Sequence, residues 1–104
     1  MRRYVYTLTD PRTSEVRYVG ETDNPARRLS QHAAANTGGA TWAWCRELRA
    51  LDLSPRMRIA EVVEANDDAT IRRTTRLAER TWLAHFSQRG ARLVNYFEHR
   101  SLSS

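Results

Sequence analysis

The sequence has 104 residues, 17 of them basic and 12 acidic, which gives a formal net charge of +5 and a pI near 10.3. This length predicts one domain with a modest core and leaves no room for a second folded module. The basic balance favours a nucleic-acid partner, and every basic residue is arginine, which suits bidentate phosphate contacts. Without a long apolar segment or leader, and with Cys45 as the single cysteine, the chain excludes a membrane span and an internal disulfide and is expected to be cytoplasmic.

The chain opens with the pattern of a β-hairpin. Residues 4–8 alternate aromatic and β-branched side chains, as a strand does, and turn residues occupy positions 10–14. Residues 16–19 form the second expected strand, which stops at Gly20. Each strand carries a tyrosine, Tyr6 in the first and Tyr18 in the second.

A helix start follows the hairpin directly. Asn24 can cap the free amides, and Pro25 suits the first helical position. Arg28 and His32 are four residues apart and therefore share a helical face, whereas Arg27 points about 100° away and is expected to contact a phosphate backbone at most. Free amides, a guanidinium and an imidazole on one face would converge on a phosphate.

The middle of the chain predicts a second helix and a third strand. Residues 33–40 are small and polar, with Gly38 and Gly39 as a joint. Residues 42–51 are expected to be helical, with Trp44, Leu48 and Leu51 on the inner face and Cys45 buried as a small hydrophobe. The tryptophans are interpreted as core or groove-lining residues, with stacking on bases as the alternative. The third strand is expected over residues 57–64.

The longest helix is expected from about residue 69 to residue 87, capped by residues 66–68. Its apolar stripe is predicted to comprise Ile71, Thr75, Ala78, Trp82 and Phe86. Glu79 lies on the border of this stripe, where a carboxylate needs a cation or hydrogen-bond donors. Periodicity leaves two interpretations open, an ordinary surface pair with Arg76 or a metal ligand.

After this helix the chain is expected to turn at Gly90 and to return Leu93 and Val94 to the core. The two-sided amide of Asn95 can tie loops together. Residues 98–104 are expected to be a frayed C-terminal tail. No zinc-ligand spacing and no phosphate-binding glycine loop is present.

Five ordered features together resemble the GIY-YIG nuclease family. The family's two tyrosine motifs correspond to residues 4–6 and 18–20, its arginine to Arg28, its glutamate to Glu79 and its asparagine to Asn95. The resemblance spans residues 4–96, and it departs from the name-giving pattern where Tyr4 replaces glycine. It implies an α/β fold in which helices flank a small, three-stranded, mostly antiparallel sheet, with residues 1–97 as a single domain.

The resemblance also implies an activity, that of a divalent-metal-dependent DNA endonuclease. On this basis Glu79 would hold one Mg²⁺ or Mn²⁺ ion and Arg28 would clamp the scissile phosphate. Tyr6 would be the general base, with its pKa lowered by nearby cations, and Tyr18 would orient water or phosphate. Gly20 would let the backbone approach the substrate, and Asn95 would support the site. His32 stays open between substrate contact or proton transfer and a structural role.

The main alternative is a catalytically inactive nucleic-acid-binding module on the same fold. A pure binder needs no glutamate near phosphate, so the intact set Tyr6, Tyr18, Arg28 and Glu79 favours the enzyme. The sequence leaves the choice of DNA open between recognition of DNA shape, a protein partner that supplies specificity, a homodimer that cuts both strands, and weak specificity.

Overall fold

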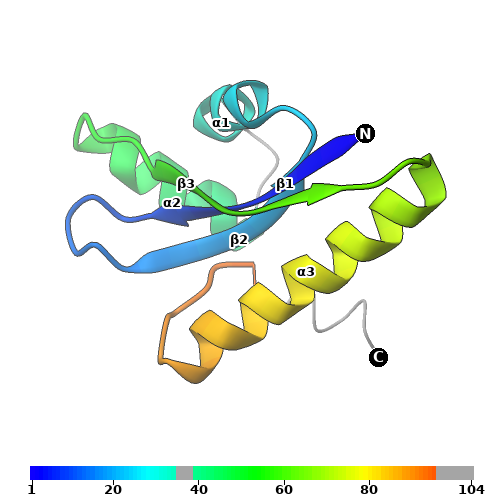
Figure 1. Ribbon diagram of the computed structural model, residues 1–104. Coiled ribbons are helices and arrows are strands. Elements are labelled where there is room, and N and C mark those ends of the chain that lie inside the picture. The colour runs from blue at the N-terminus through cyan, green and yellow to red at the C-terminus, as the bar shows by residue number, and fades with distance from the viewer. Residues whose placement is uncertain (35–38, 96–104) are drawn as a thin grey trace.

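The computed structural model describes residues 1–34 and 39–95, and these form three strands and three helices (Figure 1). In chain order the elements are β1 (Arg2–Thr9), β2 (Val16–Thr22), α1 (Pro25–Ala34), α2 (Gly39–Ala50), β3 (Arg56–Glu64) and α3 (Asp68–Gln88). The expected α/β fold with a three-stranded antiparallel sheet is confirmed. The expected tail, residues 98–104, lies outside the described residues. In the part of the chain that is described, no helix is long and apolar enough to cross a bilayer.

The sheet has β1 at its centre, with β2 and β3 antiparallel on either side. Tyr6 lies opposite Gly20 on β2 and opposite Ile59 on β3. The β1–β3 register shifts between Val5 and Tyr6, so one residue of β3, Ala60, bulges out of the ladder. The sheet therefore places the middle of β1 between both neighbours, where it is buried.

Helices cover both faces of the sheet, with α1 and α2 on one face and α3 on the other (Figure 1). Because side chains alternate along a strand, β1 contributes to two cores. Tyr6 and Leu8 form one cluster with Trp44, Cys45 and Leu48 of α2. Val5 packs in the other cluster with Val19, Leu83 and Leu93. Burial of Cys45 and a core position for Trp44, whose Nε1 donates to Asp10 at 3.1 Å, are as predicted.

In α2 and α3 the set of buried residues differs from the one that the sequence predicts. Leu51 is 54 % exposed, because α2 ends at Ala50 and the chain turns there. In α3 the buried residues are Ile71, Thr75, Glu79 and Leu83, while the other predicted stripe members, Ala78, Trp82 and Phe86, are half-buried. The predicted stripe faces the core, since Ala78, Trp82 and Phe86 also pack against it. The most buried line is rotated toward Glu79 and Leu83, because apolar character alone placed its centre away from Glu79.

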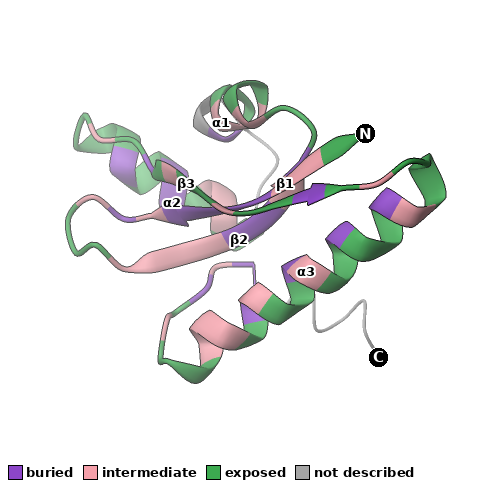
Figure 2. Ribbon diagram, in the orientation of Figure 1, coloured by how far each residue is buried: buried purple, intermediate pink, exposed green. Residues whose placement is uncertain are grey.

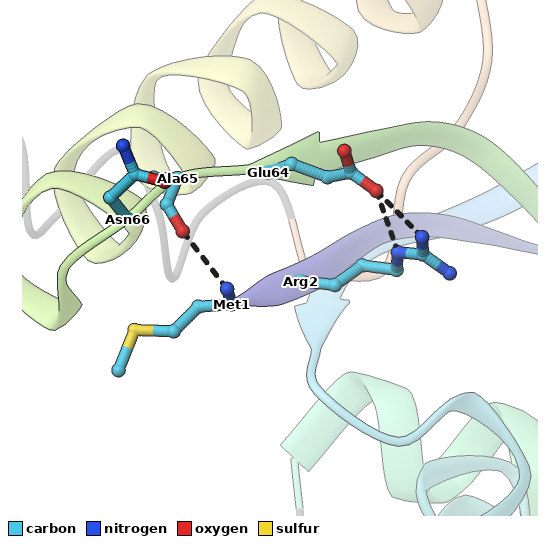
Figure 3. Close-up of a pocket in the computed structure, with 5 residues that line it drawn as sticks. All are labelled: Met1, Arg2, Glu64, Ala65 and Asn66. Atoms are coloured by element: carbon cyan, nitrogen blue, oxygen red, sulfur yellow. Dashed lines mark hydrogen bonds and ion pairs between the residues drawn. The ribbon is translucent and has the colours of Figure 1, made fainter.

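The N-terminal ends of β1 and α3 are held by polar contacts. The amino group of Met1 donates to the carbonyl of Ala65 at 2.9 Å, and Arg2 forms a 2.7 Å salt bridge with Glu64 (Figure 3). Asp67 caps α3 by accepting from the amide of Thr70 at 2.8 Å. These contacts fix the direction in which α3 leaves the sheet.

Candidate active site

Two tyrosines and a glycine form the centre of the site. The rings of Tyr6 and Tyr18 stack with their centroids 5.8 Å apart and their planes at 24°. A Cβ atom on Gly20 would lie 2.7 Å from Cε1 of Tyr18 and 2.7 Å from Oη of Tyr6. Residue 20 must therefore lack a side chain so that both tyrosines can pack over it, a reason that the sequence prediction of close substrate approach did not include.

His32 joins this aromatic cluster from α1. Its Nε2 is hydrogen-bonded to Oη of Tyr6 at 2.7 Å, and its ring meets Tyr18 edge-on at 4.7 Å. The side chain is 8 % exposed. Burial, and then the charge of Arg28, lower the pKa of His32 to about 4, so the imidazole is neutral at neutral pH.

Tyr6 holds its proton firmly. Burial raises its pKa well above the ordinary value, and the charge and hydrogen bond of Tyr18 raise it further. Arg28 lowers the pKa of Tyr6 and Glu79 raises it, both to a smaller degree. The prediction that nearby cations lower the pKa of this phenol is therefore wrong, because desolvation outweighs the arginine.

The two arginines of α1 have different surroundings. Oδ1 of Asn24 accepts from the amide of Arg27 at 3.0 Å, which confirms the predicted cap and fixes the start of the helix. Arg27 is exposed and forms a 2.9 Å salt bridge with Asp23. Arg28 is half-buried, and its Nε is buried without a hydrogen-bond partner in the described chain. Arg28 thus offers an unused donor beside the tyrosines, whereas Arg27 lies away from them.

Glu79 lies on α3, and its charge is within electrostatic reach of Tyr6. It is 8 % exposed and lines a pocket of about 240 Å³ together with Glu21 and three arginines, Arg3, Arg72 and Arg76. Burial, followed by the charge of Glu21, raises the pKa of Glu79 to about 7, while Arg76 and Arg80 lower it. The carboxyl group is thus shielded from bulk water but faces a small open pocket.

The pocket around Glu79 offers oxygen ligands of the kind that a hard divalent cation prefers, beside three arginines. Glu79 and Glu21 supply carboxylate oxygens, and the volume leaves room for several waters. In the described part of the chain no group of three or more His, Cys, Asp or Glu residues is placed to bind a metal. An ion here would therefore be held by one or two carboxylates and water, as is usual for Mg²⁺.

Asn95 supports the site through β2. Its Nδ2 donates to the carbonyl of Val19 at 2.6 Å, and its Oδ1 accepts from the amide of Val19 at 3.4 Å. The side chain is fully buried. Asn95 therefore pairs both outward-facing backbone groups of an edge strand between Tyr18 and Gly20.

Four of the predicted site residues are in contact with one another, and two more are linked to them through their charges. Tyr6, Tyr18, Gly20 and His32 are in direct contact, and Arg28 and Glu79 act on Tyr6 through their charges. Sequence reasoning missed the other pocket residues, which are Arg3, Glu21 and Arg72. A signal existed for Arg72, which lies seven residues before Glu79 and hence on nearly the same side of α3.

A second, larger pocket contains none of the predicted site residues. It measures about 610 Å³ and is lined by Met1, Arg2, Glu64, Ala65 and Asn66 (Figure 3). Its charged groups already have partners, since Arg2 pairs with Glu64 and the amino group of Met1 donates to the carbonyl of Ala65. The candidate catalytic groups thus lie at the tyrosines and the smaller pocket, away from this larger one.

Comparison with known proteins gives one match. The family model described as the GIY-YIG catalytic domain matches residues 2–88. These residues include both tyrosines, Arg28, His32 and Glu79. Neither the curated proteins nor the solved structures contain a match.

Proposed function

Since the chain belongs to the GIY-YIG family, whose members are in general nucleases, we propose that it is a divalent-metal-dependent endonuclease that hydrolyses phosphodiester bonds of DNA. The observation that carries this proposal is the hydrogen bond between Tyr6 of β1 and His32 of α1, with the charges of Arg28 and Glu79 within electrostatic reach of Tyr6. Arg28 and Glu79 shift the pKa of this phenol in opposite directions. An acid–base pair, a cation for phosphate and a carboxylate for a metal are what phosphodiester hydrolysis needs.

Arg28 would hold the scissile phosphate. Its buried Nε has no acceptor in the described chain, and leaving a buried donor unpaired costs free energy. A phosphate oxygen would supply the acceptor and form a charge-assisted bond. Phosphate binding would also balance the positive charge that helps to keep His32 deprotonated.

Proton transfer would run through Tyr6 to His32. A phenol with a raised pKa does not provide a phenolate at neutral pH, so Tyr6 alone is a poor general base. The neutral imidazole at 2.7 Å can take the phenol proton while Tyr6 takes the proton of the attacking water. Tyr6 and His32 would then act as one base, and Tyr18 would orient the water or the phosphate.

Glu79 would hold the Mg²⁺ or Mn²⁺ ion in its pocket. The bound ion would supply positive charge to stabilise the phosphate oxygens and the leaving group. Burial raises the pKa of Glu79 to about 7, and a cation bound beside it would favour the charged carboxylate. The pocket has two acidic residues, Glu79 and Glu21, and Glu21 forms a 2.7 Å salt bridge with Arg3. Glu79 is therefore the main candidate ligand.

The test is cleavage of a panel of branched, nicked and linear DNA with Mg²⁺, with Mn²⁺ and with chelator. The parent protein should cut at least one substrate, and only with metal. Glu79→Gln keeps the size of the side chain but removes its charge, so it should lose about 10²-fold or more in cutting rate while still binding DNA. Glu64→Gln is the matched control, because Glu64 is an exposed carboxylate paired with Arg2 away from the site.

The outcomes separate the enzyme from its alternative. Binding of every substrate without cutting in either metal would contradict the enzyme and support a catalytically inactive nucleic-acid-binding module. Cutting by Glu79→Gln at the parent rate would leave the nuclease in place but refute Glu79 as its metal ligand. Equal losses in Glu79→Gln and Glu64→Gln would point to a general effect of charge.

A further inference from the structure

One flank of α3 is strongly basic. It carries four arginines within nine residues, Arg72, Arg73, Arg76 and Arg80, and all four are exposed. In the ribbon of Figure 2 exposed segments recur along the whole of α3, between the buried and intermediate residues of its inner side. We call these four residues the arginine flank.

The arginine flank begins at the Glu79 pocket. At about 100° per residue, Arg72, Arg76 and Arg80 lie about 20°, 60° and 100° from Glu79 around the helix, all on the same side. Arg72 and Arg76 line the pocket itself. The charges of Arg76 and Arg80 both lower the pKa of Glu79, which places them within electrostatic reach of its carboxyl group.

The protein does little to neutralise this charge by itself. Among the four residues, Arg72 has the one salt bridge found in the described chain, to Asp68 of the same helix at 2.9 Å. Arg72, Arg76 and Arg80 follow one another at spacings of four, where like charges repel and weaken a helix. A row of like charges attracts an anionic partner, and such a partner would relieve the repulsion within the row.

We propose that the arginine flank binds the sugar-phosphate backbone of DNA on one side of the cut. This inference rests on the proposed function, because it places the backbone relative to the pocket of Glu79. From Arg72 to Arg80 the helix rises about 12 Å, and one DNA strand presents a phosphate about every 3.4 Å along the duplex axis. The flank thus spans about three to four phosphates.

The flank and Arg28 then have different tasks. Arg28 contacts the phosphate that is cut and lies in the same cluster as Tyr6 and His32. The flank contacts neighbouring phosphates and holds the strand so that the cut phosphate stays at the pocket. Contacts of this kind position a duplex without reading its sequence.

The test is the salt dependence of DNA binding, measured by fluorescence anisotropy with a labelled duplex in EDTA so that no cutting occurs. The double variant Arg76→Gln/Arg80→Gln leaves the Arg72–Asp68 pair intact. The matched control is Arg46→Gln/Arg49→Gln, which removes two exposed arginines from α2. Both doubles remove two positive charges, so an effect of net charge alone is the same in each.

The α3 double should bind at least about 10-fold more weakly than the α2 double, and its slope of log affinity against log salt should be shallower by about 2, since each lost phosphate contact removes about 0.9. Equal slopes for the two doubles would overturn the flank as a DNA site, and so would a parent protein that does not bind DNA. Far-UV circular dichroism shows that each variant is folded.

This test is independent of the proposed activity. If the protein binds DNA through the flank but never cuts it with Mg²⁺ or Mn²⁺, the proposed nuclease activity is refuted and the flank remains a DNA-binding site. If the parent protein cuts DNA but the two double variants bind DNA equally well, the nuclease activity stands and the flank is refuted as a DNA-binding site.

Discussion

Gly20 shows how a single residue position can decide the geometry of the site. The rings of Tyr6 and Tyr18 occupy the space that a side chain at position 20 would need. Burial then acts on the neighbouring groups, because it raises the pKa of Tyr6 and Glu79 and lowers that of His32. Each of these three groups is shifted toward its neutral form, whereas the arginines around them stay charged.

Gly20→Ala should damage the site directly. The added Cβ would lie 2.7 Å from both tyrosine side chains, so at least one ring must move. We expect a loss of about 1–3 kcal/mol in the free energy of unfolding, as for other overpacked positions, and a cutting rate lower by about 10-fold or more. Urea denaturation and DNA cleavage measure the two effects.

Gly90→Ala is the control that separates stability from geometry. Gly90 has a φ of +88°, which strains any residue with a side chain, but nothing lies within 4 Å of its Cβ position. This variant should lose about 1 kcal/mol of stability and should cut DNA like the parent. If Gly20→Ala also cut like the parent, the tight packing over position 20 would not matter for activity.

At the scale of elements, β2 is an edge strand whose free side is closed by Val94 and Asn95. Asn95 pairs the amide and the carbonyl of Val19, and the amide of Val94 donates to the carbonyl of Arg17 at 2.6 Å. This segment therefore stands where a fourth strand would otherwise pair. Because Val19 lies between Tyr18 and Gly20, the same contacts hold the tyrosine motif in place.

Asn95→Ala should loosen this edge. It leaves the buried amide and carbonyl of Val19 without partners, which costs about 1–3 kcal/mol for each group. We expect the free energy of unfolding to fall by about 2–4 kcal/mol and the amide of Val19 to exchange hydrogen faster. Asn66→Ala, at an exposed position, should change stability by less than about 0.5 kcal/mol. A loss below about 1 kcal/mol for Asn95→Ala would show that water replaces these bonds at little cost.

At the scale of the whole molecule, two buried groups give stability opposite pH dependences. His32 has a pKa of about 4 in the fold against 6.5 when exposed, so protonation favours the unfolded chain and stability falls as pH falls from 6.5 to 4. Glu79 has a pKa of about 7 against 4.5, so the fold binds the proton more tightly and stability rises as pH falls from 7 to 4.5. The two slopes largely cancel.

Single substitutions should therefore reveal a pH dependence that the parent protein hides. As the pH falls from 7 to 5, the free energy of unfolding of Glu79→Gln should decrease, because only the effect of His32 remains. Over the same range the free energy of unfolding of His32→Gln should increase, because only the effect of Glu79 remains. For each variant the free energy of unfolding changes by at most about 3 kcal/mol between the folded and the unfolded pKa of the remaining group. Urea denaturation at several pH values measures it.

The pH range chosen for this measurement avoids other acids. Asp10, Glu15 and Asp67 have lowered pKa values, so their contributions are lost mainly in more acidic solution. Slopes of the same sign in Glu79→Gln and His32→Gln would contradict the assignment of these two groups.

The sequence by itself determined the local features of this protein. Alternation along β1, the Asn24 cap and the Asp67 cap of α3 act within a few residues, so the elements could be predicted from residue types. The order of the tyrosine motifs, Arg28 and Glu79 likewise predicted the family. The exposure of Leu51 and the buried centre of α3 could not be predicted, because they depend on where each helix ends and how it turns on the sheet.

Only the tertiary structure decided the chemistry of the candidate site. Tyr6 and His32 are 26 residues apart in the chain, and Val19 and Asn95 are 76 apart, yet each pair is in direct contact. Desolvation depends on all the atoms that surround a group, so the raised pKa of Tyr6 and the burial of Glu79 follow from the packed fold and from no local pattern.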